Sequence, residues 1–124
     1  MDEDVVASAR EILEIAEVEA WLANGEPMPF TAGELAYARS KSDPARRLAA
    51  RLAAKRATVR LLGGGIGLQD VEVRAGVGGP PRLGLTRRAQ ERLRELGAQR
   101  VLVSLTHERR HAGAAVLLLR SQPA

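Results

Sequence analysis

One long helical segment constrains the fold more than any other part of this sequence. Asp43 followed by Pro44 is a helix-start pattern, because Asp caps a first turn and Pro is tolerated at its first position. The segment that follows is rich in Ala and carries apolar residues at helical spacing, namely Leu48, Leu52, Val59 and Leu62. The glycine triplet at residues 63–65 then ends it. We therefore predict a long helix from Pro44 to the glycines.

Before this helix, the pattern predicts a strand and two helices. Val5 to Ala9 is compatible with a short strand, and Glu11 to Ala23 carries apolar residues at helical spacing. Thr31 and Glu34 form a T-x-x-E capping box, which predicts the start of a short helix.

After the glycine triplet, the hydrophobic period changes from helical to alternating. Val71 and Val73 alternate with charged residues, which predicts a strand with one solvated face. A turn over residues 76–81 leads to a partner strand, Arg82 to Leu85. Three further elements complete the chain: a helix capped by Thr86 and two strands, Arg100–Leu105 and Gly113–Leu119, which can pair as a long antiparallel hairpin.

The partial segregation of helices and strands predicts an α+β fold with an antiparallel sheet and a long central helix. The length of 124 residues is typical of one domain, so we expect a single domain over residues 1–124. The absence of cysteine excludes a disulfide framework and a thiolate metal site. No apolar run approaches membrane-spanning length, and we expect a soluble, cytoplasmic protein without a membrane partner.

Charge is distributed unevenly along the chain, whose net charge is +4. Residues 11–38 hold six acids and no Lys or Arg, whereas residues 44–69 hold six bases and no acid. Either the two segments form oppositely charged helix faces that pack together, or the basic helix lines a phosphate site. A basic protein favours anionic partners, but the three aromatic residues lie in the acidic part and form no base-stacking platform. Nucleic acid is therefore not the expected partner.

Six segments follow one another in the order and spacing of one known family. Five of them read PFTAGELAYARS, DPARRLAARLAAKRATVRLLGGG, LQDVEV, GGPPRLGL and VLVSLTHERRHAGAAVLLL. With these in place, VVASAREILEI (Val5 to Ile15) aligns without a gap to the opening strand of that family. The segments resemble bacterial holo-(acyl carrier protein) synthases, which are single-domain phosphopantetheinyl transferases. The resemblance covers Val5 to Leu119 and implies a homotrimer with active sites between subunits.

The resemblance also implies phosphoryl transfer. In the family, the 4′-phosphopantetheine of coenzyme A is moved to a serine of acyl carrier protein. A Mg²⁺ ion held by carboxylates neutralises the diphosphate, and basic residues on the long helix handle the remaining phosphate charge. The implied ligand is coenzyme A, and the implied partner is an acyl carrier protein or a carrier-bound substrate.

Three positions of the family's site carry different residues here. The Asp of the first motif is Glu11, whose side chain is longer by one methylene. The Glu of the A-A-K-E-A pattern is Arg56, and a guanidinium cannot ligate a metal. The second Lys of that pattern is Arg60, which accepts protons poorly but binds phosphate well. The metal site implied by the resemblance is therefore degraded.

By family position, the expected catalytic residues are Glu11, Arg56, Arg60 and His107. The expected coenzyme A-binding residues are Arg51, Lys55, Arg56, Arg60, Thr106 and His107. No metal ligands are assigned. Because the positions of Glu11 and Arg56 converge on one ion in the family, we predict that these two side chains face each other as an ion pair. We expect Mg²⁺ to be absent or weakly bound.

These departures lead to competing hypotheses. The favoured one is a family member impaired in Mg²⁺-dependent transfer and repurposed for binding or other chemistry in fatty-acid or polyketide-type metabolism. The alternative is an active transferase that moves phosphopantetheine from coenzyme A to a serine of acyl carrier protein. A nucleic-acid-binding module is disfavoured. The first predicted helix carries Glu14, Glu17 and Glu19 and no base, which disfavours docking of an acidic carrier protein there.

Overall fold

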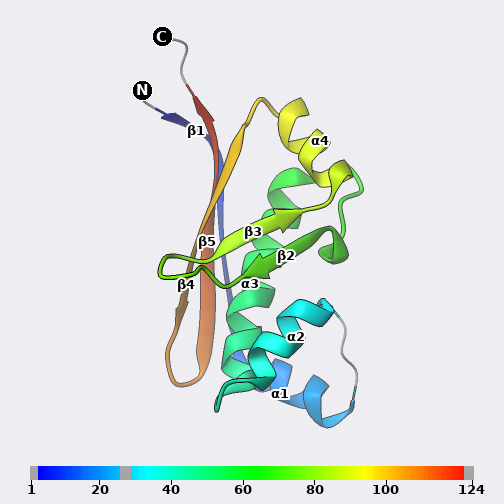
Figure 1. Ribbon diagram of the computed structural model, residues 1–124, viewed down its shortest axis with the longest axis vertical. Coiled ribbons are helices and arrows are strands. Elements are labelled where there is room, and N and C mark those ends of the chain that lie inside the picture. Colours follow the sequence, from blue (N-terminus) through cyan, green and yellow to red (C-terminus); the bar gives the residue numbers. More distant parts are fainter. Residues whose placement is uncertain (1–2, 26–28, 122–124) are drawn as a thin grey trace.

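The structure, a computed structural model, describes residues 3–25 and 29–121. One antiparallel sheet has the strand order β1–β5–β4, and a second pairs β2 with β3. The helices and the β2–β3 pair lie on one side of the larger sheet (Figure 1). The bounds are β1 Glu3–Glu14, α1 Ile15–Ala23, α2 Ala32–Arg39, α3 Pro44–Leu62, β2 Val71–Arg74, β3 Arg82–Leu85, α4 Arg87–Glu95, β4 Arg100–His107 and β5 His111–Ser121. The predicted α+β fold with a long central helix is confirmed.

Helix α3 forms the centre of the core, where it packs on β1 and β5. Alanines of α3, such as Ala53 and Ala57, are fully buried, and small side chains of this kind allow the helix to pack closely on the sheet. Gly63 ends the helix with a positive φ of 58°, a conformation that favours glycine. Asp43 holds the cap position but makes no side-chain capping bond; its carboxylate accepts a 3.0 Å bond from Arg47 Nε, which lowers the pKa of Asp43.

The predicted helix over Glu11 to Ala23 begins four residues too early. β1 continues through Glu11 to Glu14 because these residues pair with β5, with Ile12 opposite Gly113. The side chains alternate accordingly: Ile12 is 75% exposed, whereas Leu13 is 6% exposed and packs in the core. The alignment of this segment with an opening strand is thus confirmed, and Glu11 is a strand residue that pairs with Ala114.

Most other predicted elements are confirmed. Thr31 and Glu34 form the capping box of α2, and Thr86 caps α4 through the backbone N–H of Ala89. β4 and β5 form the predicted antiparallel hairpin, and each strand extends about two residues further toward the shared turn than the sequence pattern indicated. Among the described residues, no helix is long and apolar enough to cross a membrane.

The face of the larger sheet that points away from α3 is left uncovered by the described elements (Figure 1). Ile12 of β1 and Leu102 of β4, which is 43% exposed, lie on this face. A shallow groove of about 560 Å³ crosses it and is lined by residues of β1, β4 and β5, including Thr106. The chain alone therefore leaves apolar surface of its sheet in contact with solvent.

Candidate functional site

Two guanidinium groups of α3 bind carboxylates of the continuous β1–α1 segment. Arg60 Nη1 lies 2.9 Å from Glu11 Oε2, and Arg60 Nη2 donates a 2.6 Å hydrogen bond to the carbonyl oxygen of Arg10. Arg56 Nη2 lies 2.9 Å from Glu17 Oε1. The acidic and basic segments therefore pack together, as one of the two charge interpretations predicted. We call Arg56, Arg60, Glu11 and Glu17 the paired edge.

The predicted ion pair between Glu11 and Arg56 is wrong. Residues four apart on a helix are neighbours on one face, so Arg56 and Arg60 both point toward the β1–α1 segment. Arg60 reaches Glu11 at the end of the strand, and Arg56 reaches Glu17, which lies further along the chain in α1. The Arg56 guanidinium also lies 6.0 Å from the centre of the Trp21 ring. Glu11 therefore pairs with Arg60, which lies one helical turn beyond the expected partner, Arg56.

The Mg²⁺ ion implied by the family does not fit the paired edge. Each of its carboxylates already has a guanidinium partner, and Arg56 places positive charge where the family has a metal ligand. Within residues 3–25 and 29–121, no group of three or more His, Cys, Asp or Glu side chains could hold a metal ion. The donor set at this edge favours an anion over a cation.

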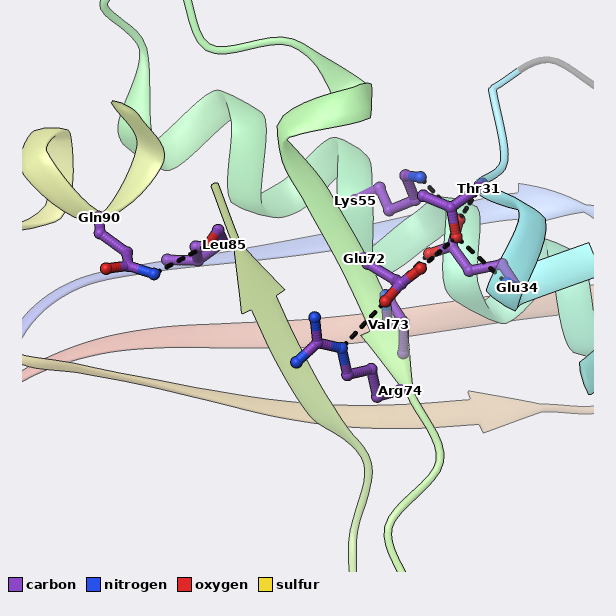
Figure 2. A network of polar contacts seen from close by, with 8 residues as sticks. All are labelled: Thr31, Glu34, Lys55, Glu72, Val73, Arg74, Leu85 and Gln90. Carbon is purple, nitrogen blue, oxygen red and sulfur yellow. Dashed lines mark hydrogen bonds and ion pairs between the residues drawn. The ribbon is translucent and has the colours of Figure 1, made fainter. Parts of the chain in front are cut away.

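Lys55, which was expected to bind phosphate, is instead buried within the protein. Its ammonium lies 2.7 Å from Glu34 Oε1, and both side chains are 0% exposed. Glu34 also accepts hydrogen bonds from the backbone N–H groups of Thr31 and Val73, so it joins α2, α3 and β2 (Figure 2). The expectation of a surface phosphate ligand at Lys55 is thus corrected, because its charge is neutralised beneath the surface.

The same network continues to the surface through Glu72. Thr31 Oγ1 donates a 2.6 Å hydrogen bond to Glu72, which also accepts from Arg74 Nε (Figure 2). These bonds, the one from Thr31 first, lower the pKa of Glu72. The network therefore fixes the start of α2 against the β2–β3 pair.

A groove of about 370 Å³ lies between α3, α2, β4 and the turn that joins β2 to β3. Arg51 and His107, both expected site residues, line it together with Tyr37 and Arg47. The Arg51 guanidinium stacks 4.1 Å from the centre of the Tyr37 ring, and its Nε is buried with no hydrogen-bond partner among the described residues. Burial lowers the pKa of Arg51. The groove is thus lined by a buried cationic side chain that has an unpaired donor, which favours an anionic ligand.

The expected site residues fall into separate regions of the chain. Arg51 and His107 share the groove, whereas Arg56, Arg60 and Glu11 form the paired edge. Thr106 lies on the uncovered sheet face and Lys55 is buried. A single chain does not bring all of these residues to one ligand.

Sequence reasoning did not assign roles in a binding or catalytic site to three residues of these regions. Glu17 was noted only as an acidic residue, although it holds Arg56. Glu34 and Tyr37 belong to the PFTAGELAYARS segment that carried the resemblance, so their motif was the signal that could have identified them. Their partners, Lys55 and Arg51, lie on α3, more than a dozen residues later in the chain.

No family model matches the chain. Among curated proteins, it is 42% identical over 92 residues to a holo-[acyl-carrier-protein] synthase from Moorella thermoacetica, covering 72% of each chain. It is 34% identical over 128 aligned positions to the synthase of Shewanella halifaxensis, covering 92% of this chain and 98% of that one. The holo-(acyl-carrier-protein) synthase from Bacillus anthracis str. Ames, solved in complex with CoA (3′,5′-ADP), is 27% identical with a TM-score of 0.75 over 94% of this chain and 98% of that one. The chain belongs to the holo-[acyl-carrier-protein] synthase family.

Proposed function

We propose that this chain is an active 4′-phosphopantetheinyl transferase, which moves phosphopantetheine from coenzyme A to a serine of an acyl carrier protein and works as a homotrimer. Relatives at 34% and 42% identity are both named synthases, which favours this alternative over the impaired member preferred from the sequence. The replacements at Glu11, Arg56 and Arg60 then alter how the diphosphate is held.

The groove around Arg51 is the observation that carries the proposal. Its buried Nε lacks a partner among the described residues, and such a donor is costly to leave unpaired. A phosphate oxygen of the nucleotide end of coenzyme A satisfies it with a charge-assisted hydrogen bond. The Bacillus anthracis relative, which binds CoA (3′,5′-ADP), supports this choice of ligand. Arg47 and His107 add donors along the same groove.

The proposed reaction is a single displacement at phosphorus. The serine oxygen of the carrier protein forms a bond to the phosphorus that carries pantetheine, and the bond from that phosphorus to 3′,5′-ADP breaks. The serine proton passes to a base. Arg60 cannot accept it, because a guanidinium stays protonated. The Glu11 carboxylate, which lies beside Arg60, is the proton acceptor that we assign at this edge.

The homotrimer accounts for the separation between the groove and the paired edge. Arg51 and Arg56 are five residues apart on α3, so their side chains point about 140° apart around its axis. One ligand that contacts both regions therefore needs the groove of one chain and the paired edge of a neighbouring chain. The uncovered sheet face, with Ile12 and Leu102, supplies apolar surface for that contact.

Because the donor set does not fit Mg²⁺, no step is assigned to a metal, and weak or absent Mg²⁺ binding stays a prediction. The exposed Glu14 and Glu19 flank the paired edge, so an acidic carrier protein docks away from α1 or presents a less acidic surface to it.

Mass spectrometry of a carrier protein tests the proposal. The full chain is incubated with coenzyme A and an apo acyl carrier protein, with EDTA in one series and Mg²⁺ in another. We expect the carrier to gain the mass of phosphopantetheine in at least one series. If coenzyme A binds but no carrier protein is modified in either, the transferase assignment is wrong and a binding role replaces it.

A further inference from the structure

The paired edge combines features of a receptor for phosphate rather than for a metal. Its two guanidiniums lie one helical turn apart on the same face of α3 and are partly exposed, with Arg56 at 34% and Arg60 at 54%. Their carboxylate partners come from β1 and α1, which follow each other without a loop. The four charges sum to zero, so the edge is neutral until one partner is exchanged.

We propose that Arg56 and Arg60 form a metal-independent diphosphate site in which Glu17 and Glu11 act as built-in competitors. The diphosphate displaces the carboxylates from the guanidiniums, and the carboxylates take them back when it leaves. This inference rests on the proposed function for the identity of the ligand, the diphosphate of coenzyme A. It assigns Glu17 a role in setting affinity that neither the resemblance nor the sequence pattern indicated.

The energetics of the exchange favour phosphate. A partly exposed ion pair such as Arg56–Glu17 contributes little, because solvent screens it and two flexible side chains must be held in place. A phosphate group offers several oxygens to the planar fork of a guanidinium, which is the stronger arrangement. Among the described residues, Arg56 uses only Nη2 in a hydrogen bond, so it keeps further N–H donors for a ligand.

The two pairs differ in how firmly they hold. Arg60 is fixed by Glu11 and by the backbone carbonyl of Arg10, whereas Glu17 is the one hydrogen-bond partner of Arg56 within residues 3–25 and 29–121, and Arg56 lies near the Trp21 ring. Arg56 is therefore the guanidinium that is freed first. Glu17 is therefore the competitor that the diphosphate displaces first, and its removal tests the role directly.

Calorimetry with inorganic pyrophosphate, in EDTA and at low salt, tests the site on the full chain. We expect pyrophosphate to bind without metal, Arg56→Gln to weaken binding about tenfold, and Glu17→Gln to strengthen it about twofold to fivefold. The matched control is Glu19→Gln, which removes the same charge from an exposed position of the same helix that has no ion-pair partner among the described residues. Equal effects of Glu17→Gln and Glu19→Gln would show a general charge effect and overturn the competitor role.

A charge reversal provides the second arm of the test. Arg56→Glu places a third carboxylate beside Glu11 and Glu17, so pyrophosphate binding by this variant should be lost in EDTA and recovered with Mg²⁺. Wild-type binding that itself requires Mg²⁺ overturns the inference, even if the carrier protein is modified. If pyrophosphate binds without metal but the carrier protein is not modified, the inference is supported and the transferase assignment is rejected. Thermal unfolding of each variant, compared with the wild-type chain, verifies that it is folded.

Discussion

Lys55 and Glu34 form an ion pair of 2.7 Å in which neither side chain is exposed to solvent. The second oxygen of Glu34 accepts a 2.8 Å hydrogen bond from the backbone N–H of Val73, so one carboxylate connects three elements. A buried charge is tolerated only when it is paired and hydrogen-bonded, and this one is both. Lys55 therefore stabilises the packing of α2, α3 and β2, and α3 carries residues of both the groove and the paired edge.

Removal of one member of this pair should be strongly destabilising. Lys55→Met leaves the Glu34 carboxylate buried without its counter-charge, and we expect a loss of about 3–5 kcal/mol in the free energy of unfolding, measured by urea denaturation. The control is the double variant with Glu34→Gln, which removes both charges and should recover part of that loss. A loss for Lys55→Met as small as that of a surface substitution would contradict the pairing.

Arg51 should matter for coenzyme A binding more than for folding. Arg51→Ala removes the buried donor and its stacking on Tyr37, and we expect coenzyme A affinity, measured by calorimetry, to fall at least about tenfold. His107→Ala should weaken binding less, because His107 is exposed at the rim of the groove. Arg94→Ala, on the exposed side of α4, is the matched control and should leave the affinity unchanged.

The uncovered sheet face should be the contact between copies of the chain. Ile12→Glu places a charge on that face, and we expect sedimentation equilibrium to show a shift from about three chain masses to one. Val77→Glu, in the fully exposed turn between β2 and β3, is the control and should preserve the assembly. A wild-type chain that is monomeric at micromolar concentration would contradict the homotrimer.

Asp70 should give the fold a measurable dependence on acid. Its pKa is lowered from 3.8, first by the hydrogen bond from the backbone N–H of Gly67 and also by Thr86 and Arg88. A lowered folded-state pKa means that its stabilisation is complete above the unfolded pKa and is lost as the pH falls through the folded one. Asp70→Asn should therefore cost about 1.5–3 kcal/mol at pH 7, and the difference from wild type should shrink below pH 3.8. A difference that does not change with pH would contradict this assignment.

Local sequence patterns predicted the elements whose signals lie within a few residues. The start and end of α3, the capping box at Thr31 and the β4–β5 hairpin all depend on neighbours along the chain. The boundary between β1 and α1 did not follow from such patterns. Ile12 fits a helical spacing with Ile15, yet it lies in a strand because its backbone pairs with β5, which is about one hundred residues away.

The partners of the charged residues were harder to predict for the same reason. Arg56 and Arg60 are both within reach of acidic residues of the β1–α1 segment, and only the packing of α3 against that segment decides which carboxylate meets which guanidinium. Family position predicted that Glu11 lies near this helix but assigned its partner one turn too early. Lys55 likewise carries no local sign of burial, since Glu34 is 21 residues away in the chain.

Glu14, the last residue of β1, is followed directly by Ile15, the first residue of α1. The absence of a loop between these two elements limits the insertions and deletions that this segment can tolerate during evolution. One inserted residue in this segment would turn the following strand side chains to the opposite face and rotate α1 by about 100°. Glu11 and Glu17 would then no longer meet α3 together. Insertions and deletions should instead accumulate in the exposed turn over residues 76–80, where an added residue leaves every strand register intact.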